Sequence, residues 1–451
     1  MVDCCNEFSR ASLLRATAGR GLPEIEPGMP VPAGTGLTRR AFVARTAGLA
    51  LAVYGAGRLG LFEEGIAAAA ARVDDPILVT VFLQGGADSL SMLYPEGDPL
   101  YRKLRPKLAL PGAAGQPFAE DDRLRWHPSL SPLAQLHAEG KVTVLPSIGY
   151  DHPDQSHFTS RHYWEVGATD AGLRTGWMGR YLDRAGAADN PLQGLSLGGQ
   201  LQPTLATAKV PVAALSAVDG YDFWVPNVWG EVEQRMLDAL GTLGAAGVSD
   251  PAAAGVAGVT SQVHSLRQQL VPFGKKGALA APVAYPQVKD RFPKRLSQLA
   301  AVIAAGLPLR CVALEATGQY DTHADQTTGL AQSLQVTADS LLSFQRDLEA
   351  RGVADRVLTL VWSEFGRRAQ ENGSNGTDHG AAGTGFLIGT RASGRMVGEF
   401  AGLKNLDDEG NLRATSDFRG LYSSLLEQWL HFDAAAVIPN AGKFARPKLV
   451  K

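Results

Sequence analysis

Residues 357–362 read Val-Leu-Thr-Leu-Val-Trp, a short β-prone run with almost nothing polar in it. Such a run is typical of a strand that is buried on both faces, as in the parallel sheet of an α/β protein. Before it, residues 330–348 carry apolar side chains at close to helical spacing. This spacing predicts a helix with one buried stripe, so the two segments together indicate an α/β fold.

Two polar clusters flank this helix and strand. The first reads Tyr-Asp-Thr-His-Ala-Asp at residues 320–325, and the second combines Ser-Glu-Phe-Gly at 363–366 with Thr-Asp-His-Gly at 377–380. Carboxylates and imidazoles in these positions are expected to converge at one edge of the sheet. Open α/β sheets bind their ligands at that edge, so we expect a functional site there.

The composition sets the broad class of the protein. The chain has 451 residues, of which 45% are hydrophobic and 20% are charged, and its net charge is −2. It can therefore bury a large core, and its charge gives no electrostatic case for binding nucleic acid. The 51 glycines lie mostly in short loops, which fits an enzyme-like α/β domain rather than a fibrous or disordered chain.

Residues 1–71 resemble a targeting segment. Thr-Arg-Arg-Ala-Phe-Val at residues 38–43 resembles a twin-arginine export signal, and small residues at 67–71 offer cleavage sites. The apolar run at 46–56 is only about half as long as a bilayer span, so no permanent membrane span is expected. We expect this segment to be removed after export by the twin-arginine machinery, which places the protein in the periplasm or outside the cell. The alternative is an amphipathic helix that stays on the protein.

The cysteines give no disulfide to the mature domain. Cys4 and Cys5 lie in the segment expected to be removed, which leaves Cys311 alone. Cys311 lies in a run that is typical of a buried strand, residues 309–314. We therefore interpret it as a small core hydrophobe and not as a catalytic thiol.

The mature domain begins with another apolar run, Pro-Ile-Leu-Val-Thr-Val-Phe-Leu at residues 76–83, which is typical of a central parallel strand. The next residues, Gln-Gly-Gly-Ala-Asp-Ser at 84–89, contain glycines that allow a tight turn. They place Asp88 just beyond the carboxyl end of the strand. A carboxylate in this position is well placed for a metal ion, and its alternative role is the N-cap of the following helix.

A second dense polar stretch, residues 150–164, predicts a loop that passes into a helix near Ser156. A helix N-terminus presents free N–H groups and a partial positive charge, which suit a phosphate or sulfate. His157 and Arg161 are four residues apart and are expected to face the same side, where the guanidinium can bind an oxyanion. The Ser156 hydroxyl is a candidate nucleophile. The alternative is that Asp154 or Ser156 only caps the helix.

The remaining chain alternates strand and helix patterns, which predicts one α/β domain over residues 72–451 with helices on both faces of a largely parallel sheet. The stretch near 244–290 is rich in alanine and glycine and then polar, and we interpret it as a mobile insertion or a surface helical hairpin. Further strands are expected near 142–146, 191–201, 210–215 and 309–314, and further helices near 131–137 and 292–305.

Four loop ends thus carry carboxylates or imidazoles toward one edge, and crowded acids need a compensating cation. The motifs Gly-Gly-Ala-Asp-Ser (85–89), Ser-His-Phe (156–158), Asp-Thr-His-Ala (321–324) and Ser-Glu-Phe-Gly-Arg-Arg (363–368) resemble DUF1501, an exported family of unknown function in the alkaline phosphatase and sulfatase superfamily. The resemblance implies an alkaline-phosphatase/sulfatase-like three-layer sandwich with a largely parallel central sheet. It also implies metal-dependent hydrolysis of phosphate or sulfate esters.

Carried over position by position, the resemblance implies a set of metal ligands at the ends of several elements. These are Asp88, Asp321, His323, Glu364, Asp378 and His379. Arg161 resembles the arginine that follows a sulfatase nucleophile. By the same spacing His157 stands where those enzymes have cysteine or serine, and Ser156 lies one residue early. Phe365 stands where an imidazole or amide ligand is expected, which leaves open one ion, two ions, or a site that binds without turnover.

The ligand chemistry favours Zn²⁺ or Mn²⁺, because carboxylates are combined with two or three imidazoles. Ca²⁺ or Mg²⁺ is the alternative if only one histidine reaches the metal. The predicted function is an exported metal-dependent hydrolase of a small-molecule or polymer-linked phosphate or sulfate ester, with Ser156 or His157 as nucleophile. The alternative is an exported metal-binding or cell-envelope scaffold that keeps the fold without catalysis. A serine esterase without metal is a third hypothesis.

Overall fold

The run at residues 76–83 forms the centre of the fold. β2 (Ile77–Phe82) lies in the middle of the central sheet, and all six of its side chains are buried. Ile77, Val79 and Val81 belong to the core on one face of the sheet, whereas Leu78 and Phe82 belong to the core on the other. Both faces are covered, as the unbroken apolar run predicted.

The computed structural model describes residues 53–54, 75–219, 231–232, 235–236, 238–239, 242 and 251–451. Apart from residues 53–54, the predicted signal segment lies outside the described residues, so its export role stays a prediction. Within the described residues the central sheet has nine strands in the order β1-β7-β6-β8-β2-β9-β12-β5-β13. Their bounds are β1 (Val53–Tyr54), β7 (Val212–Leu215), β6 (Gly194–Leu197), β8 (Cys311–Glu315), β2 (Ile77–Phe82), β9 (Val357–Trp362), β12 (Gly383–Ile388), β5 (Val142–Gly149) and β13 (Ser416–Asp417).

The sheet is parallel except at two strands. β2 pairs in parallel with β8 and β9, and the chain of parallel pairs continues through β6 to β7. β12 runs antiparallel to both β9 and β5, and β1 runs antiparallel to β7. The largely parallel sheet predicted from the strand-helix alternation is confirmed.

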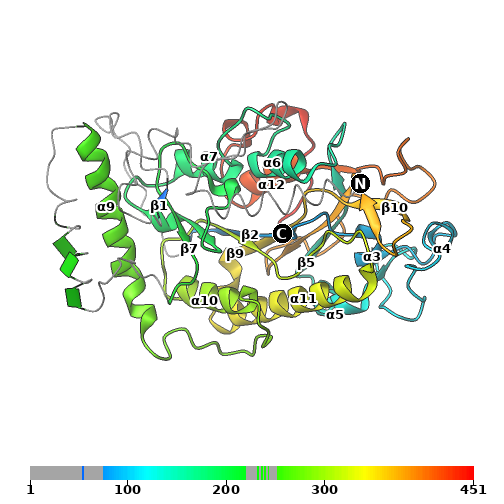
Figure 1. Cartoon of the computed structure of the whole chain (residues 1–451), viewed down its shortest axis with the longest axis horizontal. Coiled ribbons are helices and arrows are strands. Elements are labelled where there is room, and N and C mark those ends of the chain that lie inside the picture. Colours follow the sequence, from blue (N-terminus) through cyan, green and yellow to red (C-terminus); the bar gives the residue numbers. More distant parts are fainter. Residues whose placement is uncertain are drawn as a thin grey trace.

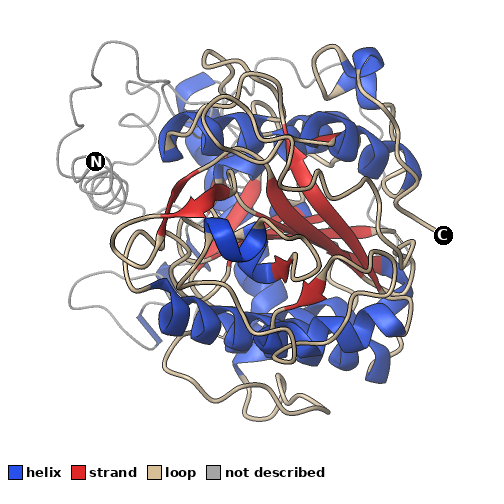
Figure 2. Ribbon diagram, turned by 90° about the vertical axis from the view of Figure 1, so that its right-hand side faces the viewer, coloured by secondary structure: helices blue, strands red, loops and turns tan. Residues whose placement is uncertain are grey.

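Helices cover both faces of this sheet. In Figure 1, α5, α10 and α11 lie below the strands and α6, α7 and α12 lie above them, and Figure 2 shows the same layers after a quarter turn. The chain therefore has the three-layer sandwich with a largely parallel central sheet that the sequence predicted. The helix bounds are α3 (Ser89–Met92), α4 (Tyr101–Leu104), α5 (Ser131–Ala138), α6 (His157–Val166), α7 (Trp177–Ala185), α9 (Pro251–Leu270), α10 (Phe292–Ala304), α11 (Gln326–Ala350) and α12 (Phe418–Gln428).

α6 begins where the sequence placed a helix start. The Ser156 hydroxyl accepts a hydrogen bond from the N–H of Phe158 at 3.2 Å, so Ser156 is the N-cap. The helix ends at Gly167, whose φ of 66° is in the left-handed region that glycine adopts most easily. The structure therefore shows Ser156 as the N-cap of α6, and its role as a nucleophile stays a prediction.

The loop after β2 packs against the loops after β8 and β9 because it contains two glycines. Gly85 and Gly86 have φ angles of 119° and 73°. A Cβ on Gly85 would lie 2.4 Å from the backbone nitrogen of Asp321, and one on Gly86 would lie 2.3 Å from the ring of Phe365. Only glycine therefore allows this close approach at the carboxyl edge of the sheet.

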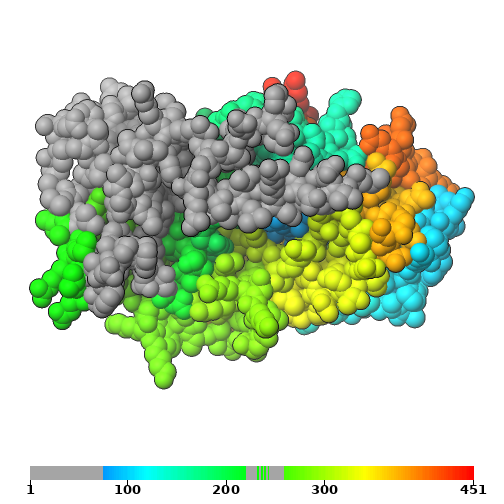
Figure 3. Space-filling model, viewed as in Figure 1, coloured from blue at the N-terminus to red at the C-terminus, as the bar shows by residue number. Residues whose placement is uncertain are grey.

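A small hairpin completes that edge. β10 (Arg367–Glu371) and β11 (Thr377–His379) are antiparallel, and Arg367 lies opposite His379. The segment around α4 packs next to this hairpin, where cyan and orange surfaces meet in Figure 3. A third small sheet pairs β3 (Leu93–Tyr94) with β4 (Arg125–Trp126).

The predicted insertion near 244–290 contains α9, which stands beside β1 and β7 at the far end of the sheet in Figure 1. Residues 244–250 lie outside the described residues, and the predicted mobility of the segment stays a prediction. Within the described part of the chain, no helix combines the length and the apolar character needed to cross a membrane. Cys311 is buried in β8, and burial raises the pKa of its thiol, as expected for a core residue.

Candidate metal centre

In the described part of the chain, three histidines bring Nε2 atoms to the carboxylate of Asp321. The Nε2 atoms of His323 and His379 lie 3.2 and 3.5 Å from Oδ1, and that of His157 lies 3.5 Å from Oδ2. Ligand atoms of His157, Asp321 and His379 lie within 4.8 Å of one another, which is close enough to share one ion. We refer to Asp321, His157, His323 and His379 as the Asp321 cluster.

Each imidazole of the cluster has an oxygen acceptor at its other ring nitrogen. The Nδ1 pairs are His157 with Glu364 (2.8 Å), His379 with the carbonyl of Gln155 (2.8 Å) and His323 with Asp378 (3.3 Å). A ring whose Nδ1–H donates to oxygen presents a lone pair at Nε2 when it is neutral. Metal-ligating histidines are oriented by such contacts.

When the three rings are neutral, their Nε2 lone pairs face the carboxylate oxygens of Asp321. Two acceptor atoms then lie against each other unless a proton or a cation lies between them. Burial lowers the pKa of His157, but its hydrogen bonds to Asp321 and Glu364 outweigh burial and raise the pKa to about 8. For His379 burial wins, and its pKa is lowered. A neutral His379 next to the Asp321 carboxylate is what a divalent ion requires, so the donor set fits Zn²⁺ or Mn²⁺.

Three separate segments position the cluster. Asp321 and His323 lie in the loop between β8 and α11, His157 is the first residue of α6, and His379 is the last residue of β11. The buried Phe365 ring lies 4.9 Å from the ring centroids of both His157 and His379. Phe365 therefore packs against the two imidazoles at a position where the sequence comparison expected a ligand.

Glu364, a predicted ligand, lies behind His157. Its carboxylate accepts hydrogen bonds from the N–H groups of Gly85 and Gly86 at 3.0 Å each and from the hydroxyl of Ser363 at 2.9 Å, besides the His157 contact. Burial raises the pKa of Glu364, but the His157 hydrogen bond and the backbone donors outweigh it and lower the pKa. Because its oxygens are used inside the protein, Glu364 orients His157 instead of facing the cluster.

Asp378, also a predicted ligand, lies behind His323 in a similar way. Its Oδ1 is the acceptor for His323 and also accepts from the side-chain amide of Asn372 at 3.1 Å. Asp378 therefore orients an imidazole. Asp321, His323 and His379 are the predicted ligands that the structure brings together.

Asp88 lies outside the cluster, contrary to the prediction that it shares the same metal site. Its carboxylate forms a bidentate ion pair with Arg105 at 2.5 and 2.8 Å, and both side chains are fully buried. The Ser91 hydroxyl and the Gln326 amide donate to the same carboxylate at 2.6 Å each. The guanidinium already supplies the cation that this buried acid needs.

Two predicted catalytic side chains have other partners. Arg161 donates to Glu165 at 2.6 Å and to Glu315 at 3.1 Å. Burial lowers the pKa of Arg161, but these two carboxylates outweigh it and raise the pKa. Arg161 is thus held by acids on α6 and β8 and not by the cluster, while Ser156 caps α6. His157, predicted as a nucleophile, belongs with Asp321 and His379 to the group whose ligand atoms could hold one ion.

Arg367 is a residue of the candidate site to which the sequence pattern assigned no role. It is fully buried and donates from Nη2 to Oδ1 of Asp321 at 2.5 Å. The sequence feature that points to Arg367 is the Ser-Glu-Phe-Gly-Arg-Arg motif, in which this arginine follows the carboxylate of Glu364 by three residues. Sequence reasoning assigned the carboxylate of that motif and left the arginine without a role.

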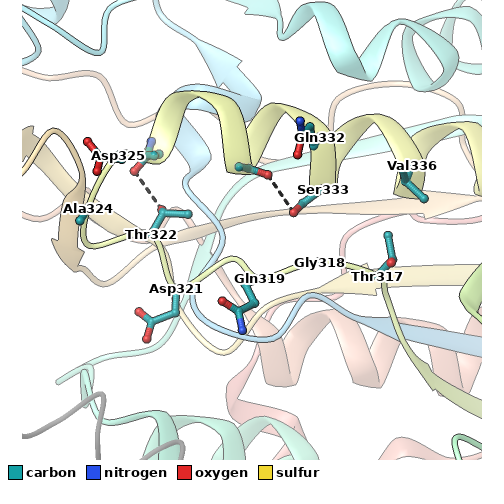
Figure 4. A pocket seen from close by; sticks show the side chains of 12 residues that line it. Thr317, Gly318, Gln319, Asp321, Thr322, Ala324, Asp325, Gln332, Ser333 and Val336 are labelled. Carbon is teal, nitrogen blue, oxygen red and sulfur yellow. Dashed lines mark hydrogen bonds between the residues drawn. The ribbon is translucent and has the colours of Figure 1, made fainter. Parts of the chain in front are cut away.

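A pocket of about 430 Å³ opens next to the Asp321 loop. Figure 4 shows it between residues 317–322 and the first turns of α11, with the Asp321 carboxylate pointing away from the helix. Gln319, Gln332 and Ser333 give it a polar lining, and the described residues that line it include no basic side chain.

The hypothesis of a serine esterase meets a specific obstacle. Gly-Leu-Ser-Leu-Gly at residues 194–198 matches the spacing of a nucleophile elbow. Ser196, however, lies inside β6, where its hydroxyl donates to the carbonyl of Gln200 at 2.6 Å and accepts from the N–H of Gln202 at 3.0 Å. It is not at a sharp turn after a strand, so the pattern carries no esterase function.

Fold and cluster together define an α/β protein with a carboxylate and imidazole centre at the carboxyl edge of a largely parallel sheet. Residues 277–417 match the family model described as "Protein of unknown function (DUF1501)". The resemblance to DUF1501 predicted from the motifs is thereby confirmed over this segment. The matched segment contains Asp321, His323 and His379, whereas His157 lies outside it.

Several solved structures are similar to this chain at low identity. Ps i-CgsB in complex with k-i-k-neocarrahexaose has 10% identity and a TM-score of 0.34, with 83% of this chain and 75% of that chain covered. The lipoteichoic acid synthase LtaP from Listeria monocytogenes has 8% identity and a TM-score of 0.29, with coverages of 90% and 80%. The soluble domain of lipooligosaccharide phosphoethanolamine transferase A from Neisseria meningitidis has 9% identity and a TM-score of 0.30, with coverages of 81% and 92%. A search of curated proteins gives no match.

Proposed function

We propose that this chain is an exported metal-dependent hydrolase of phosphate or sulfate esters. The observation that carries the proposal is the convergence of three imidazole Nε2 atoms on Asp321, each ring held at Nδ1 by an oxygen acceptor. Such fixed rings around one carboxylate are typical of metal centres. The position of the cluster at the carboxyl edge of the sheet agrees with a ligand-binding role.

His157, Asp321 and His379 would hold the ion, which leaves a coordination position open. Catalytic metal sites typically combine three protein ligands with an open position, whereas structural sites are closed. When bound, the ion would polarise an ester oxygen and lower the pKa of water. The cluster therefore supplies the three protein ligands that a catalytic site of this kind would need.

His323 is the imidazole placed to hold or move a proton. Its side chain is 28% exposed, compared with 10% for His379 and 0% for His157. Its Nδ1 lies against Asp378, which fixes the ring and leaves Nε2 facing the cluster. Because Ser156 caps α6 and His157 is a ligand, we propose water as the attacking group instead of either side chain.

Export and substrate belong to the same proposal. The twin-arginine motif at residues 38–43 supports export to the periplasm or beyond by the twin-arginine route. The substrate class is a small-molecule or polymer-linked phosphate or sulfate ester.

A second candidate is a metal-binding scaffold without catalysis. The observation that favours it is Phe365, whose ring packs against His157 and His379 in the place of a polar ligand. The oxyanion contact expected from Arg161 is also absent among its described partners, because Glu165 and Glu315 hold the guanidinium.

Elemental analysis of the purified protein, followed by assays with p-nitrophenyl phosphate and p-nitrophenyl sulfate, tests the two candidates. We expect a divalent ion and ester hydrolysis in the wild type, and loss of both in Asp321→Ala. Asp325→Asn is the matched control, because Asp325 is an acid in the same loop with a left-handed φ of 45° that asparagine tolerates. A metal-free wild type contradicts the proposal, and a metal-loaded but inert protein favours the scaffold.

A further inference from the structure

We propose that the guanidinium of Arg367 serves as a built-in second cation of the Asp321 cluster, so that the site binds one divalent ion and not two. The proposal rests on the metal site proposed above and adds its ion count. It starts from the position of Arg367 in β10, directly opposite His379 across the β10–β11 hairpin. That register inserts a fixed positive charge among the ligands.

The guanidinium is held from all its nitrogens. Nε donates to the carbonyl of Gly86 at 2.7 Å, and Nη1 donates to the carbonyl of Thr377 at 2.9 Å. Nη2 donates to Asp321 at 2.5 Å and to the carbonyl of Gly85. The side chain is fully buried, so it has no route to solvent that would vacate this position for a metal ion.

Arg367 also binds one of the two oxygens of the Asp321 carboxylate. Oδ1 accepts the hydrogen bond from Arg367 and also faces His323 and His379, whereas Oδ2 faces His157. The guanidinium thus binds the oxygen that two of the imidazoles also face, and the ligand atoms of His157, Asp321 and His379 are close enough to share one ion. Two metal ions bridged by Asp321 would need both oxygens, and a second ion near Oδ1 would be repelled by the guanidinium.

The neighbouring carboxylates do not supply ligands for a second ion. Glu364 is used by backbone N–H groups and His157, Asp88 is neutralised by Arg105, and Asp378 is held by Asn372 and His323. A second divalent ion requires additional anionic or imidazole ligands. Among the described residues of the cluster, His323 is the remaining imidazole, and its Nε2 lies 3.3 Å from Nη1 of Arg367 and 2.9 Å from Nε2 of His379. One imidazole in this position does not make a second site.

The ion count of the wild-type protein tests the inference directly. Chelator-treated full-length protein is saturated with Zn²⁺, freed of excess metal and analysed by plasma mass spectrometry, and we expect one ion per chain. Loading with Mn²⁺ gives an independent readout, since a single ion shows an uncoupled six-line electron paramagnetic resonance signal. Two ions per chain, or a spin-coupled Mn²⁺ pair, would overturn the inference while leaving a metal-dependent function intact. No bound ion would instead remove the proposed function and this inference together.

Variants of Arg367 test its role as the second cation. Arg367→Gln removes the charge, and we expect it to take up a second ion or to bind the first at least tenfold more tightly. Arg367→Lys keeps the charge and is expected to bind one ion. Arg105→Gln is the matched control, because it removes an equally buried guanidinium from Asp88 outside the cluster. If Arg367→Gln folds and binds one ion with wild-type affinity, Arg367 is not the second cation; if it does not fold, the wild-type count and the Mn²⁺ signal decide.

Discussion

Asp321 and Asp88 both pair with a buried arginine at 2.5 Å, yet their surroundings differ. Asp88 is fully buried, and its further partners are a hydroxyl and an amide. The Asp321 side chain is 16% exposed and is faced by three imidazoles. The partners of the Asp88 carboxylate are an arginine, a hydroxyl and an amide. The Asp321 carboxylate also faces imidazoles, which are groups that bind metals.

The comparison shows that an acid at the carboxyl edge of a sheet is not a ligand by position alone. Arg105 also donates to the backbone carbonyls of Ala369 at 3.0 Å and Arg368 at 2.9 Å, so its pair with Asp88 joins the α4 segment to β10. That pair supports the hairpin that carries Arg367. The Asp88 pair therefore has a structural role, and the Asp321 pair belongs to the candidate site.

Asp321→Asn has the largest expected effect. The amide keeps the size of the side chain but removes the charge that a divalent ion needs. We expect ion affinity to fall by more than about 100-fold, beyond the range for residues that only orient ligands. Titration calorimetry with Zn²⁺ on chelator-treated protein measures this loss, and wild-type affinity in the variant would contradict the site.

Asp88→Asn should give the opposite pattern, with a large loss of stability and no change in ion count. Removing one partner of a buried pair leaves Arg105 uncompensated and costs about 3–5 kcal/mol of unfolding free energy. Urea denaturation measures the loss. The control is Asp121→Asn, because Arg123 in that pair is 43% exposed and such pairs contribute about 1 kcal/mol or less. If Asp88→Asn abolishes ion binding in a folded protein, Asp88 belongs to the site after all.

Much of the fold was predictable because buried strands leave a local pattern. β2 and β9 appear as unbroken apolar runs, and the polar residues after the strands mark the edge where the site lies. The roles of the acids were not predictable, because their partners are set by the fold. The donors that occupy Glu364 come from the Gly86 turn 278 residues away, and sequence gave no sign that Arg105 would pair with Asp88.

Glu364→Gln separates orientation from ligation within the Asp321 region. Glutamine keeps one acceptor oxygen for the glycine turn but turns an amide N–H, which cannot accept from Nδ1–H, toward His157. Loss of such an orienting contact typically weakens metal binding about 10–100-fold. The comparison variant is Asp378→Asn, which acts on His323 and should weaken binding less. Zn²⁺ titration measures the loss of affinity in both variants. Equal losses would mean that His323 binds the ion as His157 does.

The smallest expected effect concerns His127, a buried imidazole whose pKa is influenced by Asp88. Burial lowers the pKa of His127 to about 4, although Asp88 raises it slightly, whereas the pKa of His157 is raised to about 8. A buried histidine with a lowered pKa binds its proton mainly in the unfolded state, so it reduces stability as the pH falls from about 6.5 toward 4.

His127→Asn should remove this acid sensitivity. Asparagine can still accept the hydrogen bond that the His127 side chain receives from the N–H of Ser129 at 3.0 Å, but it does not titrate. Between pH 7 and pH 5 we expect the wild type to lose about 1–2 kcal/mol more unfolding free energy than the variant. Thermal unfolding at both pH values measures the difference. Parallel losses in the two proteins would show that the acid sensitivity of the fold comes from other groups, and that His127 near Asp88 does not contribute to it.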